Sequence, residues 1–362
     1  MKKLKLGMVG GGQGGFIGGV HRFAARLDDR WELVAGALSS NPERAEASAK
    51  ELGIARSYAS FEEMATAEAA RDDGIDAVSI VTPNHMHAAP AIAFLNAGIH
   101  VICDKPLAAT QEQADAIAEA AATSSARFFL THNYTGYPLI RQARKLVADG
   151  ELGAIRIIQA EYAQDWLAEE THNKQADWRT DPAQAGAGAI GDIGTHAFNL
   201  LSFVTGLKTE ALSAELHSMV PGRQVDDNAH IRLRMEGGAK AQVWASQVAV
   251  GHENDLRLRV YGEKGSLSWR QENPNELWFT RFGQPPQLLR RGYGSDEGTR
   301  IPPGHPEGYL EGFANIYSEI ADAISNGADA SHLPDITSGM AGMWFIRACI
   351  ESNAKDGGWI TS

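Results

Sequence analysis

The stretch LKLGMVGGGQGGFIGGVHR, residues 4–22, decides the fold of the first half of the chain. An apolar strand is expected over residues 4–9, and it runs directly into a glycine-rich turn. Within this turn Gly10, Gly12 and Gly15 stand in the spacing G-x-G-x-x-G. The first glycine permits a tight turn with positive φ, the second leaves room for a pyrophosphate, and the third lets the next helix pack close to the strand.

The helix expected after the turn begins near Phe16 and Ile17. Its free N–H groups and the positive end of its dipole then face bound phosphates. In a chain with 38 glycines the same letters also occur as a flexible turn. The position of the motif, after a strand and before alternating strands and helices, favours a dinucleotide site.

Composition limits the class of protein. A length of 362 residues predicts about two domains of roughly 150 residues each. The net charge of −12 argues against nucleic acid and anionic membranes as partners. The two cysteines, Cys103 and Cys349, form no disulfide framework and fit a reducing compartment such as the cytoplasm. The sequence contains no run of 18 apolar residues, so no membrane span is expected.

Strands alternate with helices through the first 131 residues. Further strands are expected at 31–38, 77–81, 101–103 and 128–131, and helices at 42–52, 61–70, 88–96 and 111–123. Such alternation implies right-handed crossovers and a parallel sheet, whose ligands lie beyond the carboxyl ends of the strands. We expect the first domain to cover residues 1–131.

The second half has a different pattern. AHIRLRM at 229–235 and LRLRVY at 256–261 alternate apolar and polar residues, which indicates strands with one buried face in an antiparallel sheet. More strands are expected at 155–160, 242–250, 266–269 and 277–282, with a hairpin turn at 263–265, and helices at 138–149, 196–205, 309–325 and 336–352. The second domain is expected over 132–362, with its last helix near the junction.

The end of the second strand bears on cofactor choice. NAD-binding proteins usually carry an acidic residue there, but this strand ends with Leu38, Ser39 and Ser40, and Arg44 follows one turn into the next helix. Two hydroxyls and a guanidinium suit a 2′-phosphate, which favours NADP(H) over NAD(H). The alternative is that the serines are loop residues and Arg44 is a solvated charge.

Two short segments carry the catalytic hypothesis. In Asp104-Lys105-Pro106, the proline restricts Lys105 to extended backbone, admits a cis bond, and directs the amine at the ligand edge of the sheet. A lysine there can stabilise an alkoxide or donate to a carbonyl oxygen, although a lone Lys-Pro is also common at surfaces.

In the second segment Asp192 and His196 are four residues apart and share a helical face. A carboxylate that holds an imidazole is an effective proton-transfer unit, although such a pair is also a common structural contact. The glycines of residues 186–194 favour a close approach of this backbone to a ligand. Asn133 and Tyr134 follow the last strand of the first half and are candidates to face a substrate.

Other motifs are weaker. His85 and His87 lack further ligands at metal-binding spacing, so no metal is expected. Arg290 and Arg291 are interpreted as a solvated loop, and residues 304–307 as a loop that reaches the site or is only structural.

Taken together, these segments resemble the Gfo/Idh/MocA family of sugar and cyclitol oxidoreductases over nearly the full chain. The matching segments are GGGQGG at 10–15, VTPNHMH at 81–87, CDKP at 103–106, WRTDP at 178–182 and AGAGAIGDIGTH at 185–196. The family usually has Glu-Lys-Pro where this chain has Asp104 before the lysine. The resemblance implies a Rossmann domain followed by an α/β domain with a large, open, mainly antiparallel sheet that often makes oligomer contacts.

The resemblance also implies roles for residues. Lys105 corresponds to the catalytic lysine, and Asp192 and His196 to the Asp–His pair; these three residues, with Asn133 and Tyr134, are the expected substrate contacts. Ser39, Ser40 and Arg44 resemble the arrangement in NADP-using anhydrofructose reductases of the family. The remaining expected cofactor contacts are Thr82, Pro83, Asn84 and His87 along the nicotinamide ribose, Asp104 and Lys105, and Trp178 and Arg179.

The expected activity is reversible hydride transfer between NAD(P) and a secondary alcohol or ketone of a sugar, anhydrosugar or cyclitol, in a homodimer or homotetramer. His196 would accept the hydroxyl proton, Asp192 would orient and support His196, and Lys105 would stabilise the alkoxide. Whether Lys105 or His196 makes the direct proton transfer stays open. The alternatives are an enzyme for an open-chain or non-carbohydrate carbonyl, and a dinucleotide-sensing protein without turnover.

Overall fold

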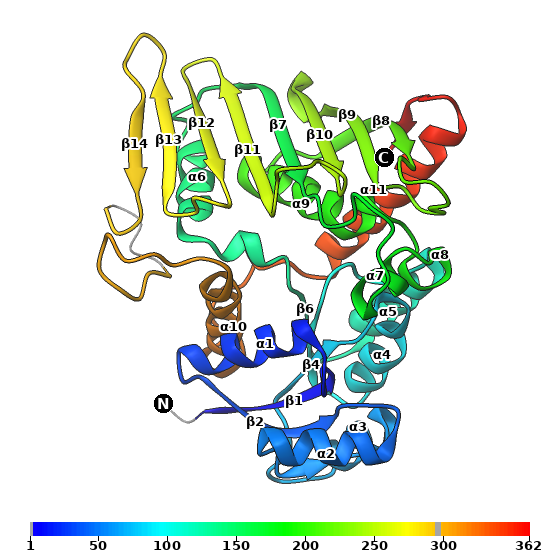
Figure 1. Cartoon of the computed structure of the whole chain (residues 1–362). Helices are drawn as coiled ribbons and strands as arrows, with labels where there is room; N and C mark the ends of the chain where they lie inside the picture. Colours follow the sequence, from blue (N-terminus) through cyan, green and yellow to red (C-terminus); the bar gives the residue numbers. More distant parts are fainter. Residues whose placement is uncertain (1–2, 294–297) are drawn as a thin grey trace. The chain divides into compact units, whose positions relative to one another are not determined.

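The computed structural model describes residues 3–293 and 298–362, and the chain divides into two compact units (Figure 1). The first unit combines Met1–Asn133 with Tyr309–Met343, and the second combines Tyr134–Gly308 with Trp344–Ser362. The domain bounds of 1–131 and 132–362 stay a prediction. The described units differ from them where Tyr309–Met343 groups with the first unit.

The first unit contains a six-stranded, fully parallel sheet in the order β3-β2-β1-β4-β5-β6. The sheet order reverses between β1 and β4, and at such a switch point ligands bind beyond the carboxyl ends of the strands. The parallel sheet predicted from the alternation is confirmed. The strands are β1 Leu4–Gly10, β2 Trp31–Ala37, β3 Arg56–Ser57, β4 Ala77–Val81, β5 His100–Cys103 and β6 Phe128–Leu130.

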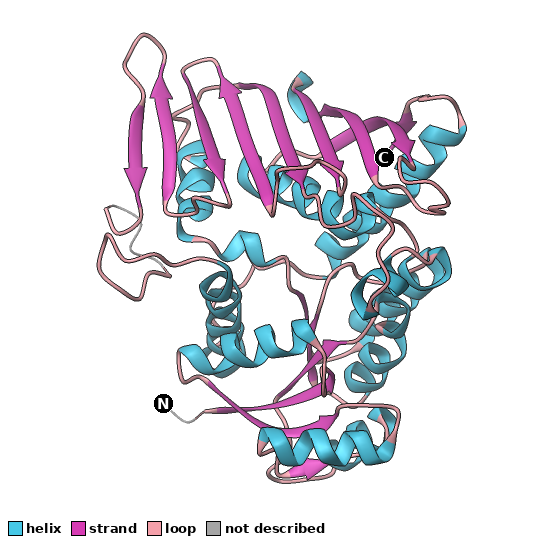
Figure 2. Cartoon of the chain, viewed as in Figure 1, coloured by secondary structure: helices cyan, strands magenta, loops and turns pink. Residues whose placement is uncertain are grey.

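Helices flank this sheet (Figure 2). They are α1 Phe16–Leu27, α2 Pro42–Leu52, α3 Phe61–Ala69, α4 Ala88–Asn96, α5 Gln111–Thr123 and α10 Tyr309–Asn326. Local sequence sets their ends: the Asn41 side chain accepts the Arg44 N–H at the start of α2, and Gly53 ends that helix with φ of +66°.

Helix α10 joins the first unit because it completes a hydrophobic core there. Phe313, Ile316, Tyr317 and Ile320 are buried against α1 and the sheet, and the Trp31 indole N–H donates to the Tyr317 carbonyl at 2.9 Å. Each fully buried side chain of this size contributes about 1.5–3 kcal/mol to folding. This packing partner is distant in sequence, so periodicity alone did not reveal it.

The second unit contains a nine-stranded sheet in the order β14-β13-β12-β11-β7-β10-β9-β8-β15 (Figure 1). Only β7 and β10 pair in parallel, so the sheet is mixed and mainly antiparallel, as predicted. The strands are β7 Ile155–Ala163, β8 Thr209–His217, β9 Asn228–Met235, β10 Lys240–Ser246, β11 Asp255–Gly262, β12 Gly265–Arg270, β13 Glu276–Arg281, β14 Gln287–Arg290 and β15 Ile360–Thr361.

Helices α6 (Pro138–Ala148) and α9 (Thr195–Thr205) pack on this sheet, α6 against β12 and β13 and α9 against β7, β10 and β11. Helix α11 (Ile336–Ala354) contributes its second half to the same unit. Two short helices, α7 (Lys174–Arg179) and α8 (Pro182–Ala185), follow β7. Across the described residues, no helix combines the length and the apolar character needed to cross a membrane.

Candidate active site

The glycine-rich turn after β1 has the backbone that its spacing requires. Gly10 has φ of +79°, and Gly11 and Gly14 also have positive φ. A Cβ at Gly12 would lie 2.7 Å from the Leu38 carbonyl oxygen, so the packing of the turn requires a glycine at this position. The tightest approach of α1 to the turn occurs at Gly18, where a Cβ would lie 2.5 Å from the Gly11 Cα.

A depression of about 360 Å³ opens at this turn, lined by residues 12–16 with Arg22, Ser48, Glu51 and Leu52. The Ser48 hydroxyl accepts the Gln13 N–H, and the Gln13 amide donates to Glu51 at 2.9 Å. Arg22 donates to the Gly11 carbonyl at 2.6 Å. The start of α1 at Phe16 and Ile17 therefore follows a braced turn with room for an anionic group, which fits a dinucleotide pyrophosphate.

The end of β2 carries no carboxylate. Ser39 accepts the Asn41 N–H at 3.1 Å, while Ser40 and Arg44 are exposed. The Arg44 guanidinium is thus accessible to a phosphate at this corner of the first unit.

The loops after β4 and β5 are tied together by His87. Its ring is fully buried, and its two nitrogens lie 2.9 Å from the Thr82 and Pro106 carbonyl oxygens. Burial lowers the pKa of His87, which favours a neutral ring. The resemblance places Thr82, Pro83, Asn84 and His87 along the ribose. In the structure His87 also braces the two loops, through the carbonyl oxygens of Thr82 and Pro106, and the ribose contacts stay a prediction.

Lys105 follows β5, and its peptide bond to Pro106 is cis. The neighbouring Asp104 accepts the Thr131 hydroxyl at 2.9 Å. Burial by itself raises the pKa of Asp104, but the facing His21 ring and the charge of Lys105 hold that pKa well below its usual range. An ionised carboxylate therefore stands beside the lysine.

His132 was missed by sequence reasoning. It is buried after β6, and burial, reinforced by the charge of Lys105, lowers its pKa to about 3, so the ring is neutral near pH 7. Asn133 beside it is 1% exposed, and its Nδ2 donates to no other described residue. The only sequence signal was their position at the ligand edge of the sheet.

In the second unit Asp192 lies in a π-helical turn, Ile190–Gly194, that leads into α9. Such turns recur at functional sites. The Asp192 carboxylate accepts the Gln247 amide at 3.0 Å and lies 3.3 Å from the Arg179 Nε. The helix predicted over residues 196–205 corresponds to α9, and Asp192 lies in the wider turn before it, so the four-residue spacing of Asp192 and His196 is not that of one regular α-helix.

His196 stands in the first turn of α9 and is 8% exposed. Its ring meets Tyr134 edge-on at 4.9 Å between centroids and lies 6.1 Å from Tyr162. The two tyrosine hydroxyls are 2.6 Å apart, and Tyr162 also donates to Asn254. Burial raises the pKa of Tyr162, so its hydroxyl stays protonated.

A half-buried aspartate, Asp226, holds the π-helical turn. Its carboxylate accepts the N–H groups of Gly188 and Ile190 at 2.9 and 2.8 Å, and burial raises its pKa against the effect of these donors. A Cβ at Gly188 would lie 1.8 Å from the Asp226 carbonyl oxygen. The glycine at 188 is thus explained by this contact rather than by a ligand.

Arg179 reaches Asp192 from α7. Its guanidinium lies over the Trp178 ring at 4.3 Å and donates to Gln175 at 2.5 Å. The family resemblance implies that Trp178 and Arg179 approach the cofactor or the site, and this stays a prediction. The structure adds a contact of Arg179 to the Asp192 carboxylate.

The structure also bears on the expected loops at Arg290 and Arg291 and at residues 304–307. Arg291 is 3% exposed and pairs with Glu307 and Asn275, so the interpretation as a solvated residue is wrong. Glu307 serves that loop by accepting the Arg300 and Ile301 N–H groups. The described residues contain no group of three or more His, Cys, Asp or Glu arranged to hold a metal ion.

A six-stranded parallel sheet with a braced glycine-rich turn at its switch point, joined to a second α/β unit, defines a dinucleotide-dependent oxidoreductase of two domains. Family models agree: residues 4–132 match the oxidoreductase family with an NAD-binding Rossmann fold, and residues 140–268 match the GFO/IDH/MocA C-terminal domain. The chain belongs to the Gfo/Idh/MocA family and is an NAD(P)-binding oxidoreductase.

Similar proteins span the whole chain. An oxidoreductase from Sinorhizobium meliloti has 55% sequence identity and a TM-score of 0.92, with both chains fully covered. An inositol dehydrogenase homolog from Azotobacter vinelandii, complexed with NADH and myo-inositol, has 37% identity and a TM-score of 0.91 over 100% of this chain and 98% of that one. A levoglucosan dehydrogenase from Pseudarthrobacter phenanthrenivorans is 30% identical over 99% of this chain and 98% of its own.

Proposed function

We propose that this oxidoreductase catalyses reversible hydride transfer between NAD(P) and the carbon that bears a secondary hydroxyl in a sugar, anhydrosugar or cyclitol. The observation that carries the proposal is Lys105 at the ligand edge of the parallel sheet, beside an ionised carboxylate and a neutral imidazole. Similarity to a levoglucosan dehydrogenase and to an inositol dehydrogenase homolog supports this substrate class.

In this proposal the glycine-rich turn holds the pyrophosphate. Gly10, Gly12 and Gly15 shape the turn, and Phe16 and Ile17 present the N–H groups at the start of α1. The bound nicotinamide supplies the hydride acceptor in oxidation and the donor in reduction. Thr82, Pro83, Asn84, Asp104 and Lys105 are the proposed contacts on the nicotinamide side, with His87 as the brace beneath them and Trp178 and Arg179 contributed by the second unit.

We further propose a preference for NADP(H). The absence of a carboxylate at the described end of β2, with Ser39 and Ser40 there and an exposed Arg44, supports a 2′-phosphate partner. Titration with NADPH and NADH tests this preference. Arg44→Ala is expected to weaken NADPH binding by roughly tenfold, about 1.4 kcal/mol, and to leave NADH binding unchanged. Tighter binding of NADH by the unmodified enzyme would contradict the preference.

The proposed chemistry moves one proton and one hydride. In oxidation His196 accepts the substrate hydroxyl proton, Asp192 orients His196, and Lys105 stabilises the developing alkoxide. Asn133 and Tyr134 are proposed to bind further substrate hydroxyls. In reduction the same groups act in reverse, and the lysine is the alternative direct proton donor.

Incubation with NAD⁺ or NADP⁺ and a panel of polyols, cyclitols and anhydrosugars tests the function. Absorbance at the reduced-nicotinamide band is expected with at least one member of the panel. Turnover only with open-chain or non-carbohydrate alcohols would overturn the substrate class, and tight cofactor binding without any turnover would favour a sensor.

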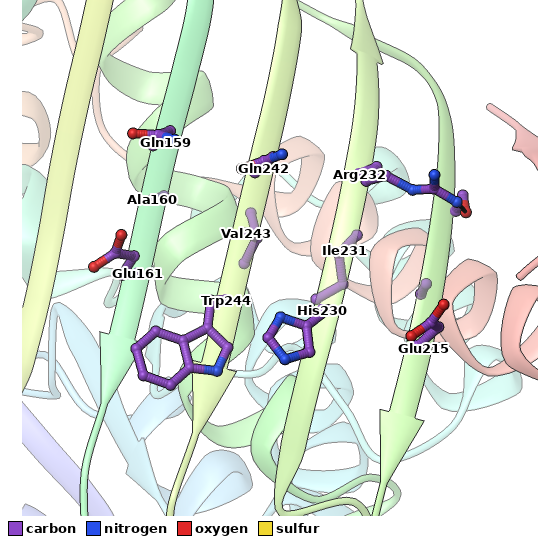
Figure 3. A pocket seen from close by; sticks show the side chains of 12 residues that line it. Gln159, Ala160, Glu161, Glu215, His230, Ile231, Arg232, Gln242, Val243 and Trp244 are labelled. Carbon is purple, nitrogen blue, oxygen red and sulfur yellow. Dashed lines mark hydrogen bonds between the residues drawn. The ribbon is translucent and has the colours of Figure 1, made fainter. Parts of the chain in front are cut away.

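We also propose a homodimer or homotetramer in the cytoplasm. The sheet of the second unit exposes Ile157 (50%) and Trp278 (47%), and outward side chains of β7 to β10 line a depression of about 340 Å³ (Figure 3). Exposed apolar side chains on such a face support subunit contact. The buried thiols of Cys103 and Cys349 support a reducing compartment. A monomer in sedimentation equilibrium would contradict the assembly.

A further inference from the structure

A buried histidine of the first unit has no part in the chemistry proposed above. His21 lies on α1 and is fully buried, enclosed by Ser79 on β4, Asp104 after β5, and Phe313 and Tyr317 on α10. Burying a polar ring is costly unless its nitrogens are satisfied, so its surroundings indicate what it does.

One end of the ring is fixed. The His21 Nδ1 lies 2.8 Å from the Tyr317 hydroxyl and 3.2 Å from the Ser79 hydroxyl, and the Tyr317 hydroxyl donates to Ser79 at 2.9 Å. With the Ser79 hydroxyl donating to Nδ1, the ring proton lies on Nε2. These three polar groups close a triangle. Phe313 packs against the ring at 5.0 Å, and Tyr317 meets it edge-on at 5.7 Å, so rotation of the imidazole is blocked.

The other end of the ring faces the residue before the lysine. The His21 Nε2 lies 3.7 Å from the Asp104 Oδ1 and has no hydrogen-bond partner among the described residues. An ordinary N–H···O bond is about 2.9 Å, so a small shift of the carboxylate would close this distance. Asp104 Oδ1 already accepts the Thr131 hydroxyl, which holds the carboxylate on the side of His21.

We propose that His21 is a positioning residue for hydride transfer, since its fixed Nε2 holds the Asp104 carboxylate behind Lys105. The inference rests on the proposed function, because Lys105 is the group that this carboxylate serves. A fixed anion next to the lysine attracts its side chain, which limits where the amine can lie when it stabilises an alkoxide. Helix α10 thus brings Tyr317 from a distant part of the chain to support the residue before the lysine.

The test compares two replacements of the imidazole. A glutamine amide nitrogen can reach the position of Nε2, whereas an asparagine amide reaches only that of Nδ1. His21→Asn is expected to lower kcat by roughly 10–100-fold, with less than about a threefold change in KM for NAD(P), and His21→Gln is expected to recover most of this loss. The pH profile of kcat is measured for the same variants, and any change of the profile in His21→Asn is expected to be recovered in His21→Gln.

Tyr317→Phe is a second variant in case His21→Asn does not fold. It removes only the hydroxyl that holds Nδ1, and a fall in kcat of roughly 3–10-fold is expected. Tyr58→Phe is the control, because it also removes a hydrogen-bonded tyrosine hydroxyl of the first unit, but one that donates to Glu68, away from this cluster. It is expected to keep kcat and its pH profile.

The outcomes separate this inference from the proposed function. If Lys105→Met abolishes turnover while His21→Asn and Tyr317→Phe keep normal kcat and pH profiles, the positioning role is overturned and the function stands. If Lys105→Met keeps near-normal turnover, the proposed role of the lysine fails first, and the role of His21 fails with it.

Discussion

Adjacent glycines in α1 give a sharp test of how the dinucleotide turn is built. A Cβ at Gly18 would lie 2.5 Å from the Gly11 Cα, whereas a Cβ at Gly19 would meet only the Arg22 guanidinium at 3.8 Å. Both glycines lie in the same helix turn, so replacement by alanine gains the same helix propensity, about 1 kcal/mol. The two variants then differ only in the contact with the turn.

The expected loss of stability in Gly18→Ala follows from the contact of the added Cβ with Gly11. Real Cβ atoms meet their neighbours at 3.4–4 Å, so Gly18→Ala must push Gly11 away by about 1 Å. Overpacking of this kind costs about 1–3 kcal/mol, and Gly18→Ala should be less stable than Gly19→Ala by that amount. The displaced turn should also raise the Kd for NAD(P)H roughly tenfold, about 1.4 kcal/mol, with no change in Gly19→Ala.

Thermal unfolding of the two variants and titration with NAD(P)H by fluorescence measure both effects. Gly19→Ala is the matched control, because it carries the same added methyl group in the same helix. Equal stabilisation and equal cofactor affinity in the two variants would refute the argument that Gly18 permits the close approach of α1.

Two further predictions concern Asp226 and His132. Asp226→Ala leaves the N–H groups of Gly188 and Ile190 without their acceptor. We therefore expect a loss of about 1–3 kcal/mol in unfolding free energy, and a lower kcat because the turn that carries Asp192 is loosened. Unchanged thermal unfolding and an unchanged kcat would contradict this role. The folded-state pKa of His132 is lowered to about 3, below an unfolded value near 6.5, so its neutral form stabilises the fold above pH 6.5 and this stability is lost as pH falls toward 3. We measure the unfolding free energy by denaturant at several pH values between 6.5 and 4. In His132→Gln this free energy should change with pH by about 1.4 kcal/mol per pH unit less than in the unmodified protein. The same pH dependence in both proteins would show that the ring does not titrate with unfolding.

Sequence patterns predicted the parallel sheet well because its strands are short apolar runs bounded by helix signals. Asn41 and Gly53 mark the two ends of α2, for example, and each acts through neighbouring backbone. The alternation at 229–235 likewise matches β9, where buried and exposed residues alternate. Local rules suffice for such elements because the information lies within a few residues.

Other strands were missed for an equally physical reason. β8 (Thr209–His217) has the mixed sequence TEALSAELH, and β14 and β15 are only four and two residues long. These segments are strands because a neighbouring strand offers hydrogen bonds, and such pairing leaves little trace in the segment itself. β10 ends at Ser246 rather than at residue 250 because the chain turns toward Gln247 and its contact with Asp192.

Some residues of the candidate site could be predicted from sequence motifs, and others could not. Lys105, Asp192 and His196 belong to motifs that stand out in the chain, whereas His21, His132, Asp226 and Gln247 acquire their positions only through folding. Asp226 meets Gly188 from 38 residues away, and Tyr317 meets His21 from 296 residues away. No periodicity or spacing links such pairs, so residues that support the proposed catalytic groups are visible only in the structure.

The most direct measurement of the central claim is turnover by Lys105→Met, made together with its affinity for NAD(P). General acid–base or electrostatic catalysis by one group contributes roughly 10²–10⁴-fold. We predict a loss of turnover in that range with Kd for NAD(P) within about threefold of the unmodified enzyme. Turnover near that of the unmodified enzyme, with the same cofactor affinity, would contradict the account.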